Sequence, residues 1–376
     1  MNEPEVALVL SPEQWVEDLH RHCADHGGAR VRQLVVDPTL ALEEDYGVLV
    51  VSHRWPGLTR GLVETLHAGG REILGVFDPL EPAAAAHLAV LGVERTIASD
   101  AAMSDFVGAL REIAPASPPR GDPLVPGVAE APAARIIAVG GAAGAGATEI
   151  AIAFAQGVSR HAHVVLVDGD ECSPGLAVRL ALPIDPNLRT AVDAVEHGLG
   201  ELVDATLRVD GMEAIAGLPN PAAWSHVRAG EVVRVVRALA RQAATVVVNV
   251  GSHLEDVPTP SHGRYAISRA LVNVSDAVIA VGAGTPVGVV RLLSWCASAR
   301  ALATDAALHI VVNGVPRDPF RREEVADEIL RSVTAASLTF VPRDRRVDIA
   351  GWAGATVPRG PFTKALRQLV SAVSRP

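Results

Sequence analysis

Short apolar runs alternate with helical patterns along the first third of the chain. The runs lie at residues 5–10, 31–36, 47–51, 73–77 and 95–98. Between them, apolar side chains recur at helical spacing over residues 12–26, 57–68, 82–91 and 101–113. Strands that alternate with helices indicate an α/β fold with a sheet covered on both faces. The pattern predicts a doubly wound, flavodoxin-like domain over residues 1–114.

The same alternation continues at larger scale over residues 133–376. Strand-like runs lie at 136–139, 163–167, 213–217, 245–250, 277–281, 308–312 and 338–341, with helical patterns such as 230–242 and 287–302 between them. We expect one large, mainly parallel sheet in a second domain. The two regions are separated by residues 115–132, which contain six prolines. Because proline lacks an N–H group and fixes φ, this stretch predicts an extended linker.

Composition narrows the class of protein. Hydrophobic residues make up 49% of the chain and aromatic residues only 3%, which suits the aliphatic core of a parallel sheet. The net charge of −10 argues against a large non-specific DNA footprint. Three widely spaced cysteines match no metal-ligand spacing, and neither a signal peptide nor a membrane-spanning run is visible. We expect a soluble cytoplasmic protein with reduced thiols.

A glycine-rich segment lies between the run at 136–139 and a helical pattern at 149–156. It consists of Gly141, Ala142, Ala143, Gly144, Ala145, Gly146, Ala147 and Thr148. Gly141 and Gly146 have the spacing of a P-loop, whose backbone N–H groups and helix N-terminus bind phosphate. Thr148 stands where a hydroxyl binds Mg²⁺, but Ala147 replaces the lysine. The chain's only lysine is Lys364, far along the sequence.

Two readings of this segment stay open. Backbone N–H groups bind an anion without a lysine, so the first reading is weak binding of ATP or ADP with magnesium. Hydrolysis needs cationic stabilisation of the γ-phosphate, and Arg135 or Arg160 are candidate substitutes by sequence proximity alone. In the second reading, the glycines serve only the close packing of strand and helix.

Polar residues end three later strands of the second region. Asp168 and Asp170 follow the run at 163–167, Asn249 ends the run at 245–249, and Asn313 follows the run at 308–312. With the loop, these motifs resemble in order the MinD/ParA family of deviant Walker ATPases. The resemblance covers nearly all of residues 133–376. It implies a homodimer with nucleotide between the protomers.

The resemblance also implies roles for single residues. Thr148 and Asp168 would support Mg²⁺, Asp170 would position the attacking water, and Asn313 would contact adenine. The family pattern puts its two loop lysines at Ala142 and Ala147 of this chain, and both are lost. Asn249 stands where the family has an acid. These departures predict a degenerate P-loop that is not an efficient enzyme, and leave Asp170 as the catalytic residue only if the site is active.

The first region resembles the receiver domains of response regulators in order and size. The first strand is followed by Ser11-Pro12-Glu13 and the third by Ser52-His53, so the acidic pair and the phosphoacceptor are missing. We therefore expect a receiver-like fold without phosphotransfer chemistry.

An inactive receiver-like domain ahead of a degenerate P-loop domain resembles the CpaE/TadZ group of pilus-assembly localisation proteins. It resembles more closely the actinobacterial CpaE-like proteins called septum-site-determining proteins (Ssd). The resemblance implies recruitment to a cell pole or septum, and partners in pilus, secretion or division machinery. Dimerisation and weak ATP binding, rather than turnover, would carry this function.

Two alternatives remain. One is a slow MinD-like ATPase that cycles on and off the membrane, although the apolar face of the last helical pattern, 362–373, is expected to pack against the sheet. The other is a nucleoid-binding, ParA-like partition protein. The acidic net charge counts against binding to DNA.

Overall fold

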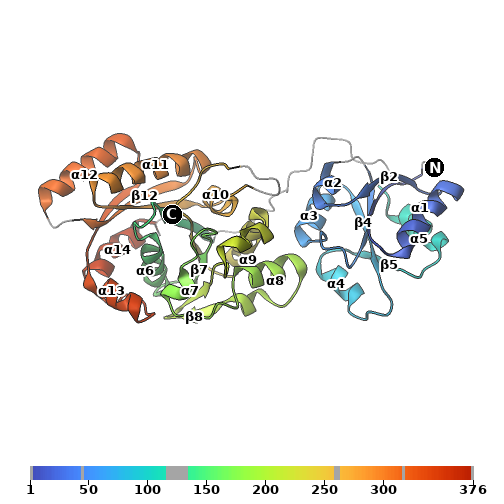
Figure 1. Ribbon diagram of the computed structural model, residues 1–376, viewed down its shortest axis with the longest axis horizontal. Helices are drawn as coiled ribbons and strands as arrows, with labels where there is room; N and C mark the ends of the chain where they lie inside the picture. Colours follow the sequence, from blue (N-terminus) through green and yellow to red (C-terminus); the bar gives the residue numbers. More distant parts are fainter. Residues whose placement is uncertain (1–2, 44–45, 116–133, 258–262, 316–317, 374–376) are drawn as a thin grey trace. The chain divides into compact units, whose positions relative to one another are not determined.

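The computed structural model describes residues 3–43, 46–115, 134–257, 263–315 and 318–373. By its internal contacts the chain forms two compact units (Figure 1). The first comprises Met1–Glu130 with Glu196–Leu199, and the second Ala131–Val195 with Gly200–Pro376. Of the expected linker at 115–132, only Pro115 lies within the described residues.

The first unit contains a five-stranded parallel sheet. Its strands are β1 (Glu5–Val9), β2 (Arg30–Val35), β3 (Val48–Ser52), β4 (Glu72–Phe77) and β5 (Arg95–Ala98). They lie in the order β2-β1-β3-β4-β5, which is a doubly wound order. All five strands were predicted, and the central strands β1, β3 and β4 are continuous apolar runs because they are buried on both faces.

Helices cover both faces of this sheet. They are α1 (Gln14–His26), α2 (Pro38–Glu43), α3 (Arg60–Ala68), α4 (Ala84–Val90) and α5 (Met103–Ile113). Helices α1 and α5 pack on one face through Trp15, Leu19 and Phe106, while α2, α3 and α4 pack on the other. Helix α2 was missed because its six residues are too few to show helical spacing.

The second unit contains an eight-stranded sheet. Its strands are β6 (Arg135–Gly141), β7 (Val164–Asp168), β8 (Leu207–Val209), β9 (Met212–Ile215), β10 (Thr245–Asn249), β11 (Ala277–Ala283), β12 (Ala307–Val315) and β13 (Ser337–Pro342). The order is β13-β12-β11-β6-β10-β7-β9-β8, and only the β8–β9 pair is antiparallel. Seven of these strands were predicted. The three-residue strand β8 was missed, although Asp210-Gly211, both with positive φ, is a hairpin-turn signal.

Two layers of helices enclose this sheet. The helices are α6 (Ala147–Ser159), α7 (Leu176–Arg179), α8 (Leu188–His197), α9 (Ala229–Ala240), α10 (Ala266–Asn273), α11 (Pro286–Leu302), α12 (Pro319–Ser332), α13 (Arg345–Trp352) and α14 (Pro361–Val373), with 3₁₀ turns η1 (Leu202–Ala205) and η2 (Pro221–His226). Buried side chains of α8 to α12 share one core, and those of α6, α7, α13 and α14 share the other.

The last helix packs as its apolar face predicted. Phe362, Leu366 and Leu369 of α14 are buried in the same core as α6. At Gly157 of α6 a Cβ atom would lie 2.8 Å from a methyl group of Val370, so the glycine allows the two helices to approach closely. Within the described residues, no helix combines the length and apolarity that crossing a bilayer requires.

The core under α6 gives a test of the fold. Phe154 is fully buried, whereas Phe320 at the start of α12 is 77% exposed. Truncating Phe154 to alanine should lower the free energy of unfolding by about 3–5 kcal/mol, because a cavity replaces the ring. Phe320→Ala, the matched control, should change it by no more than about 0.5 kcal/mol. Urea denaturation of the full chain measures both, and equal effects would contradict the packing.

Candidate functional site

The polar motifs of the second unit meet at one edge of its sheet. Because the strands run parallel, their carboxyl ends share this edge, and Asp168 of β7 lies beside Asn249 of β10 in register. The glycine-rich loop leaves the neighbouring strand β6, and Asn313 lies near the end of β12. The structure therefore brings together the loop, both aspartates and both asparagines that the sequence singled out.

The loop requires glycine at several positions for different reasons. A Cβ atom at residue 141 would lie 2.0 Å from the carbonyl oxygen of Val281, in the adjacent strand β11. Gly144 and Gly146 have φ values of +75° and +88°, in the left-handed region that side chains disfavour. Between them, Ala145 N–H donates to the carbonyl of Ala142 at 3.0 Å and closes a turn. The sequence spacing thus encodes a specific backbone path.

This path ends at the uncapped N-terminus of α6. Gly146 is the N-cap residue and has no side chain to accept a hydrogen bond. The N–H groups of Ala147, Thr148 and Glu149 precede the first helical bond, which runs from Ile150 N–H to the Gly146 carbonyl at 3.1 Å. Three N–H donors and the positive end of the helix dipole therefore converge here. The arrangement fits a phosphate group.

Both positions that the family fills with lysine hold methyl groups. Ala142 and Ala147 are half-buried and pack against the core beneath α6. The suggested replacements are wrong. Arg135 begins β6 at the opposite end of the strand and donates to the carbonyl of Val373. Arg160 follows the far end of α6, about 20 Å from the loop at 1.5 Å per residue.

Asn313 contacts the loop itself. Its side-chain nitrogen donates to the carbonyl of Ala145 at 2.9 Å, and a Cβ atom at Gly146 would lie 2.5 Å from that nitrogen. The family resemblance implied a contact with adenine. In the structure this amide N–H₂ group supports the glycine-rich loop, so Asn313 positions the loop's backbone.

Asp168 is buried and saturated with hydrogen bonds. One carboxylate oxygen accepts from the N–H groups of Gly175 and Leu176, both at 2.9 Å. The other accepts from the Asn249 side chain at 2.9 Å and from Asp170 N–H at 3.4 Å. A carboxylate has about four lone-pair sites, and all four are used. The side chain is only 1% exposed, and this burial raises its pKa to about 6 despite the hydrogen bonds.

The polar groups at this edge of the sheet therefore fit a phosphate group better than they fit a metal ion. Asp168 has no lone pair left for the hydration shell of Mg²⁺, and Asn249 supplies no negative charge. Asp170 accepts from Cys172 N–H and Ser173 N–H, both at 2.9 Å. Asp168 and Asp170 thus both bind backbone N–H groups of the segment that follows β7. Of the two groups that the resemblance implied as support for Mg²⁺, Thr148 and Asp168, this leaves Thr148. No step of hydrolysis follows from this geometry.

One contributor to the site was missed by sequence reasoning. Arg179, in α7, forms an ion pair with Glu149 in the first turn of α6, with Nη2 2.9 Å from Oε2. Its Nη1 also donates to the carbonyl of Ala355 at 2.8 Å. The partners are 30 and 176 residues away in the sequence, so no local spacing indicated them.

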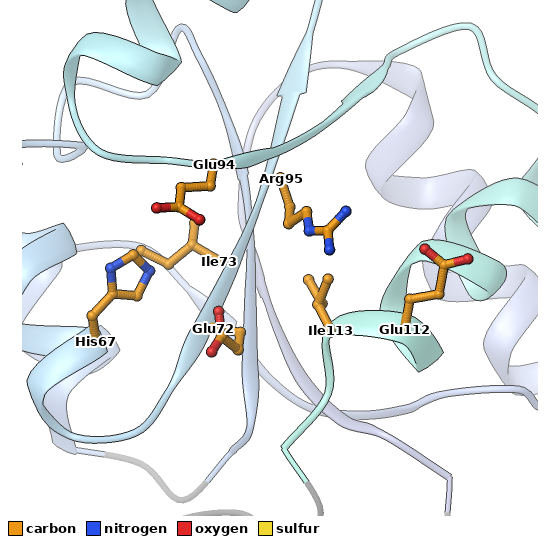
Figure 2. Close-up of a pocket in the computed structure, with 7 residues that line it drawn as sticks. All are labelled: His67, Glu72, Ile73, Glu94, Arg95, Glu112 and Ile113. Carbon is orange, nitrogen blue, oxygen red and sulfur yellow. The ribbon is translucent and has the colours of Figure 1, made fainter.

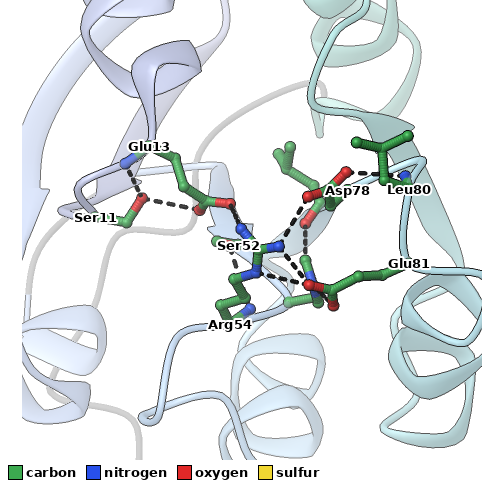
Figure 3. Close-up of polar contacts among 9 residues, drawn as sticks. Ser11, Glu13, Ser52, Arg54, Asp78, Leu80 and Glu81 are labelled. Atoms are coloured by element: carbon green, nitrogen blue, oxygen red, sulfur yellow. Dashed lines mark hydrogen bonds and ion pairs between the residues drawn. The ribbon is translucent and has the colours of Figure 1, made fainter.

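Figure 3 shows a second polar cluster, at the carboxyl edge of the five-stranded sheet. Arg54 lies 2.8 Å from Asp78 and 3.6 Å from Glu13, and its Nε donates to Glu81 at 3.2 Å. His53 also bonds Glu81, at 2.9 Å. The hydrogen bonds from Arg54 and His53 hold the pKa of Glu81 below its usual value. The acids at this edge are thus neutralised from within the unit.

A shallow pocket of about 290 Å³ lies at the opposite, amino edge of that sheet (Figure 2). Its lining is mostly charged: His67, Glu72, Ile73, Glu94, Arg95, Glu112 and Ile113. Among the described residues, no group of histidine, cysteine and acidic side chains is arranged to hold a metal ion.

Comparisons with known proteins support the fold of the larger unit. No model of a protein family matches the chain, and no curated protein matches it. Solved structures do. A ParA family ATPase from Chlorobium tepidum TLS matches with a TM-score of 0.52 and 15% identity, over 64% of this chain and 99% of that one. Cobyrinic acid a,c-diamide synthase from Mycobacterium smegmatis, with an ATP analogue and magnesium, matches with a TM-score of 0.50 and 15% identity, over 64% and 93%.

The MinD cell-division ATPase of Pyrococcus furiosus matches with a TM-score of 0.48 and 18% identity, over 64% of this chain and 98% of that one. At such identities the likeness establishes the fold alone. The chain therefore contains an α/β unit whose fold is similar to that of the ParA family ATPase, as the order of motifs predicted.

The loop contains a glycine in close contact with a neighbouring strand, Gly141, and a glycine with positive φ in open space, Gly144. Comparing the two gives a first test of the site. Gly141→Ala should lower the free energy of unfolding by about 3 kcal/mol or more, because the new methyl group meets the backbone of β11. Gly144→Ala should cost about 1–2 kcal/mol, since residue 144 has positive φ but open space around it. Urea denaturation measures both. A larger cost at residue 144 would contradict the described loop.

The buried carboxyl group gives a second test. Asp168 binds a proton in the folded protein between its ordinary pKa of 3.8 and about 6, where the unfolded chain does not. Stability contributed by this proton is therefore lost as pH rises through that window. The Asp168→Asn variant lacks this titrating group, so its stability should not fall in this way as pH rises. The difference in unfolding free energy between wild type and variant should therefore vary with pH between about pH 4 and about pH 7.

Urea denaturation at several pH values measures this difference. Asp305→Asn, at an exposed position, is the charge-matched control and should follow the wild-type profile. Parallel profiles for wild type and Asp168→Asn would show that Asp168 does not titrate in this range.

Proposed function

We propose that the protein is a positioning protein of the CpaE/TadZ/Ssd kind, in which the larger unit binds nucleotide phosphate weakly and does not turn it over efficiently. The observation that carries this proposal is the preserved phosphate-binding backbone beside two absent lysines. The loop glycines and the uncapped N-terminus of α6 remain, while Ala142 and Ala147 supply no charge. A site under selection for hydrolysis needs a cation at the γ-phosphate.

The proposed organisation is a receiver-like domain at 1–114, a proline-rich linker at 115–132 and a degenerate P-loop domain at 133–376. The strand order of the first unit supports a flavodoxin-like fold. Its carboxyl-edge acids are paired with Arg54, which favours a structural or interaction role over phosphotransfer. Such a unit contributes an interface rather than chemistry.

The proposed mode of action is dimerisation and recruitment. A homodimer would present two larger units to a pilus, secretion or division apparatus at a pole or septum. Because the nucleotide is bound by backbone donors, ATP and ADP would stabilise the fold rather than drive a cycle. The slow membrane-cycling ATPase and the nucleoid-binding partition protein have no observation in their favour beyond the shared fold.

The test is the thermal stability of the full chain with and without excess ATP. A ligand that binds only the folded state stabilises it by about 2.7 kcal/mol at a hundredfold excess over Kd. We expect an upward shift in Tm with ATP or ADP. No shift at millimolar nucleotide would contradict nucleotide binding and leave the loop as an architectural turn.

Restoring the missing lysine separates binding from turnover. Ala147→Lys should tighten ATP binding by about tenfold, since a charge-assisted hydrogen bond contributes about 1.5 kcal/mol or more. It should not produce turnover, because Asp168 and Asn249 still supply no metal shell. Ala301→Lys, which puts the same charge at an exposed position of α11, is the control and should leave ATP binding unchanged. Steady ATP hydrolysis by Ala147→Lys would favour the slow ATPase instead.

A further inference from the structure

Side-chain hydrogen bonds fix the stretch that follows β7, residues 169–175, here called the β7–α7 segment. Asp168 accepts from the N–H groups of Asp170, Gly175 and Leu176. Asp170 accepts from those of Cys172 and Ser173. Two carboxylates of the chain thus bind five backbone N–H groups within seven consecutive residues. The segment's path is set by the protein itself.

Asn249 makes this arrangement compatible with a buried carboxylate. Its side-chain nitrogen donates to Asp168 at 2.9 Å, and both side chains are 1% exposed. An aspartate at 249 would put a second negative charge beside Asp168 in a site closed to water, which is strongly unfavourable. The Asn249 side chain therefore does more than replace the acid that the family pattern has at this position. It supplies a donor that orients Asp168 toward its own segment.

The segment is also held from the side of α10. Glu171 is 2% exposed and accepts from Ser268 Oγ at 2.5 Å and from Ser268 N–H at 3.2 Å. Ser268 lies in the first turn of α10, where a carboxylate is favoured by the helix dipole. Ser268 Oγ in turn accepts from Gly251 N–H at 3.0 Å, just after β10. This carboxylate fixes the middle of the segment.

Arg179 holds the far end. Its side chain is 11% exposed and joins α7 to Glu149 of α6, the helix that begins at the phosphate-binding loop. Its bond to the carbonyl of Ala355 adds a third element, beyond the end of α13. A partly buried Arg–carboxylate pair with two parallel bonds is a strong and directional contact.

From these contacts we propose that the β7–α7 segment is a permanent clamp, held by Asp168, Asn249, Glu171 and Arg179 in one conformation whether or not the adjacent loop holds nucleotide. Nucleotide would then change the stability of the unit but not the shape of this edge. A partner that recognises the edge would meet the same surface in both states. The inference deepens the proposed function, on which it rests for the identity of the ligand as a nucleotide.

Hydrogen–deuterium exchange of the full chain tests the clamp, followed in peptides that cover residues 168–181. Without nucleotide, the N–H groups that Asp168 and Asp170 hold should exchange at least about tenfold more slowly than in an unstructured peptide. Saturating Mg-ATP, with binding verified by the shift in Tm, should change their rates by less than about twofold. Fast exchange without nucleotide, or strong protection only with Mg-ATP, would overturn the proposal.

Variants link the protection to the named side chains. Asn249→Asp should speed exchange across 170–176 by about tenfold, which corresponds to about 1.4 kcal/mol. Asn273→Asp, at the exposed end of α10, is the matched control and should leave it unchanged. If Asn249→Asp does not fold, Arg179→Gln should still speed exchange at the α7 end, with Arg291→Gln at an exposed position of α11 as its control. Wild-type rates in both clamp variants would overturn the assignment.

The two proposals fail in different ways. If ATP gives no shift in Tm, nucleotide binding is contradicted, while slow exchange without nucleotide still supports the clamp. If ATP binds and the segment becomes protected only then, the nucleotide site stands and the clamp is overturned.

Discussion

The carboxyl edge of the larger sheet depends on one buried interaction, the hydrogen bond from Asn249 to Asp168. It joins β10 to β7 and orients a carboxylate whose remaining lone pairs bind the backbone that follows. Burial of an unpaired carboxylate would be costly, and here four donors offset part of that cost. Because the protein itself uses every lone pair of Asp168, this carboxylate fixes the backbone that follows β7.

The shape of the glycine-rich loop does not depend on lysine side chains. Its path is set by a glycine that allows β6 to lie against β11, by two glycines with positive φ, and by the bond from Asn313 to Ala145. The two alanines at the lysine positions pack into the core. A backbone site of this kind offers donors to an anion without any charged side chain.

The sequence was sufficient for twelve of the thirteen strands and for the place of the loop, because buried parallel strands are continuous apolar runs and glycine spacing is local. It was insufficient for short elements such as β8 and α2, which have too few residues to show a hydrophobic periodicity. The site was predicted as a set of residues but not as a set of contacts. That Asp168 binds Gly175 and Leu176, or that Arg179 pairs with Glu149, depends on side-chain directions that only packing decides.

The central claim is that the protein's own side chains hold the β7–α7 segment in one conformation. Its most direct test is a pair of crystal structures, one grown without nucleotide and one with Mg-ATP at the loop. The account predicts that the backbone of residues 168–181 superposes to within about 1 Å and that Asn249 still donates to Asp168 in both. A displacement of more than about 2 Å, with Asp168 turned toward a magnesium ion, would contradict it and restore a nucleotide-driven switch.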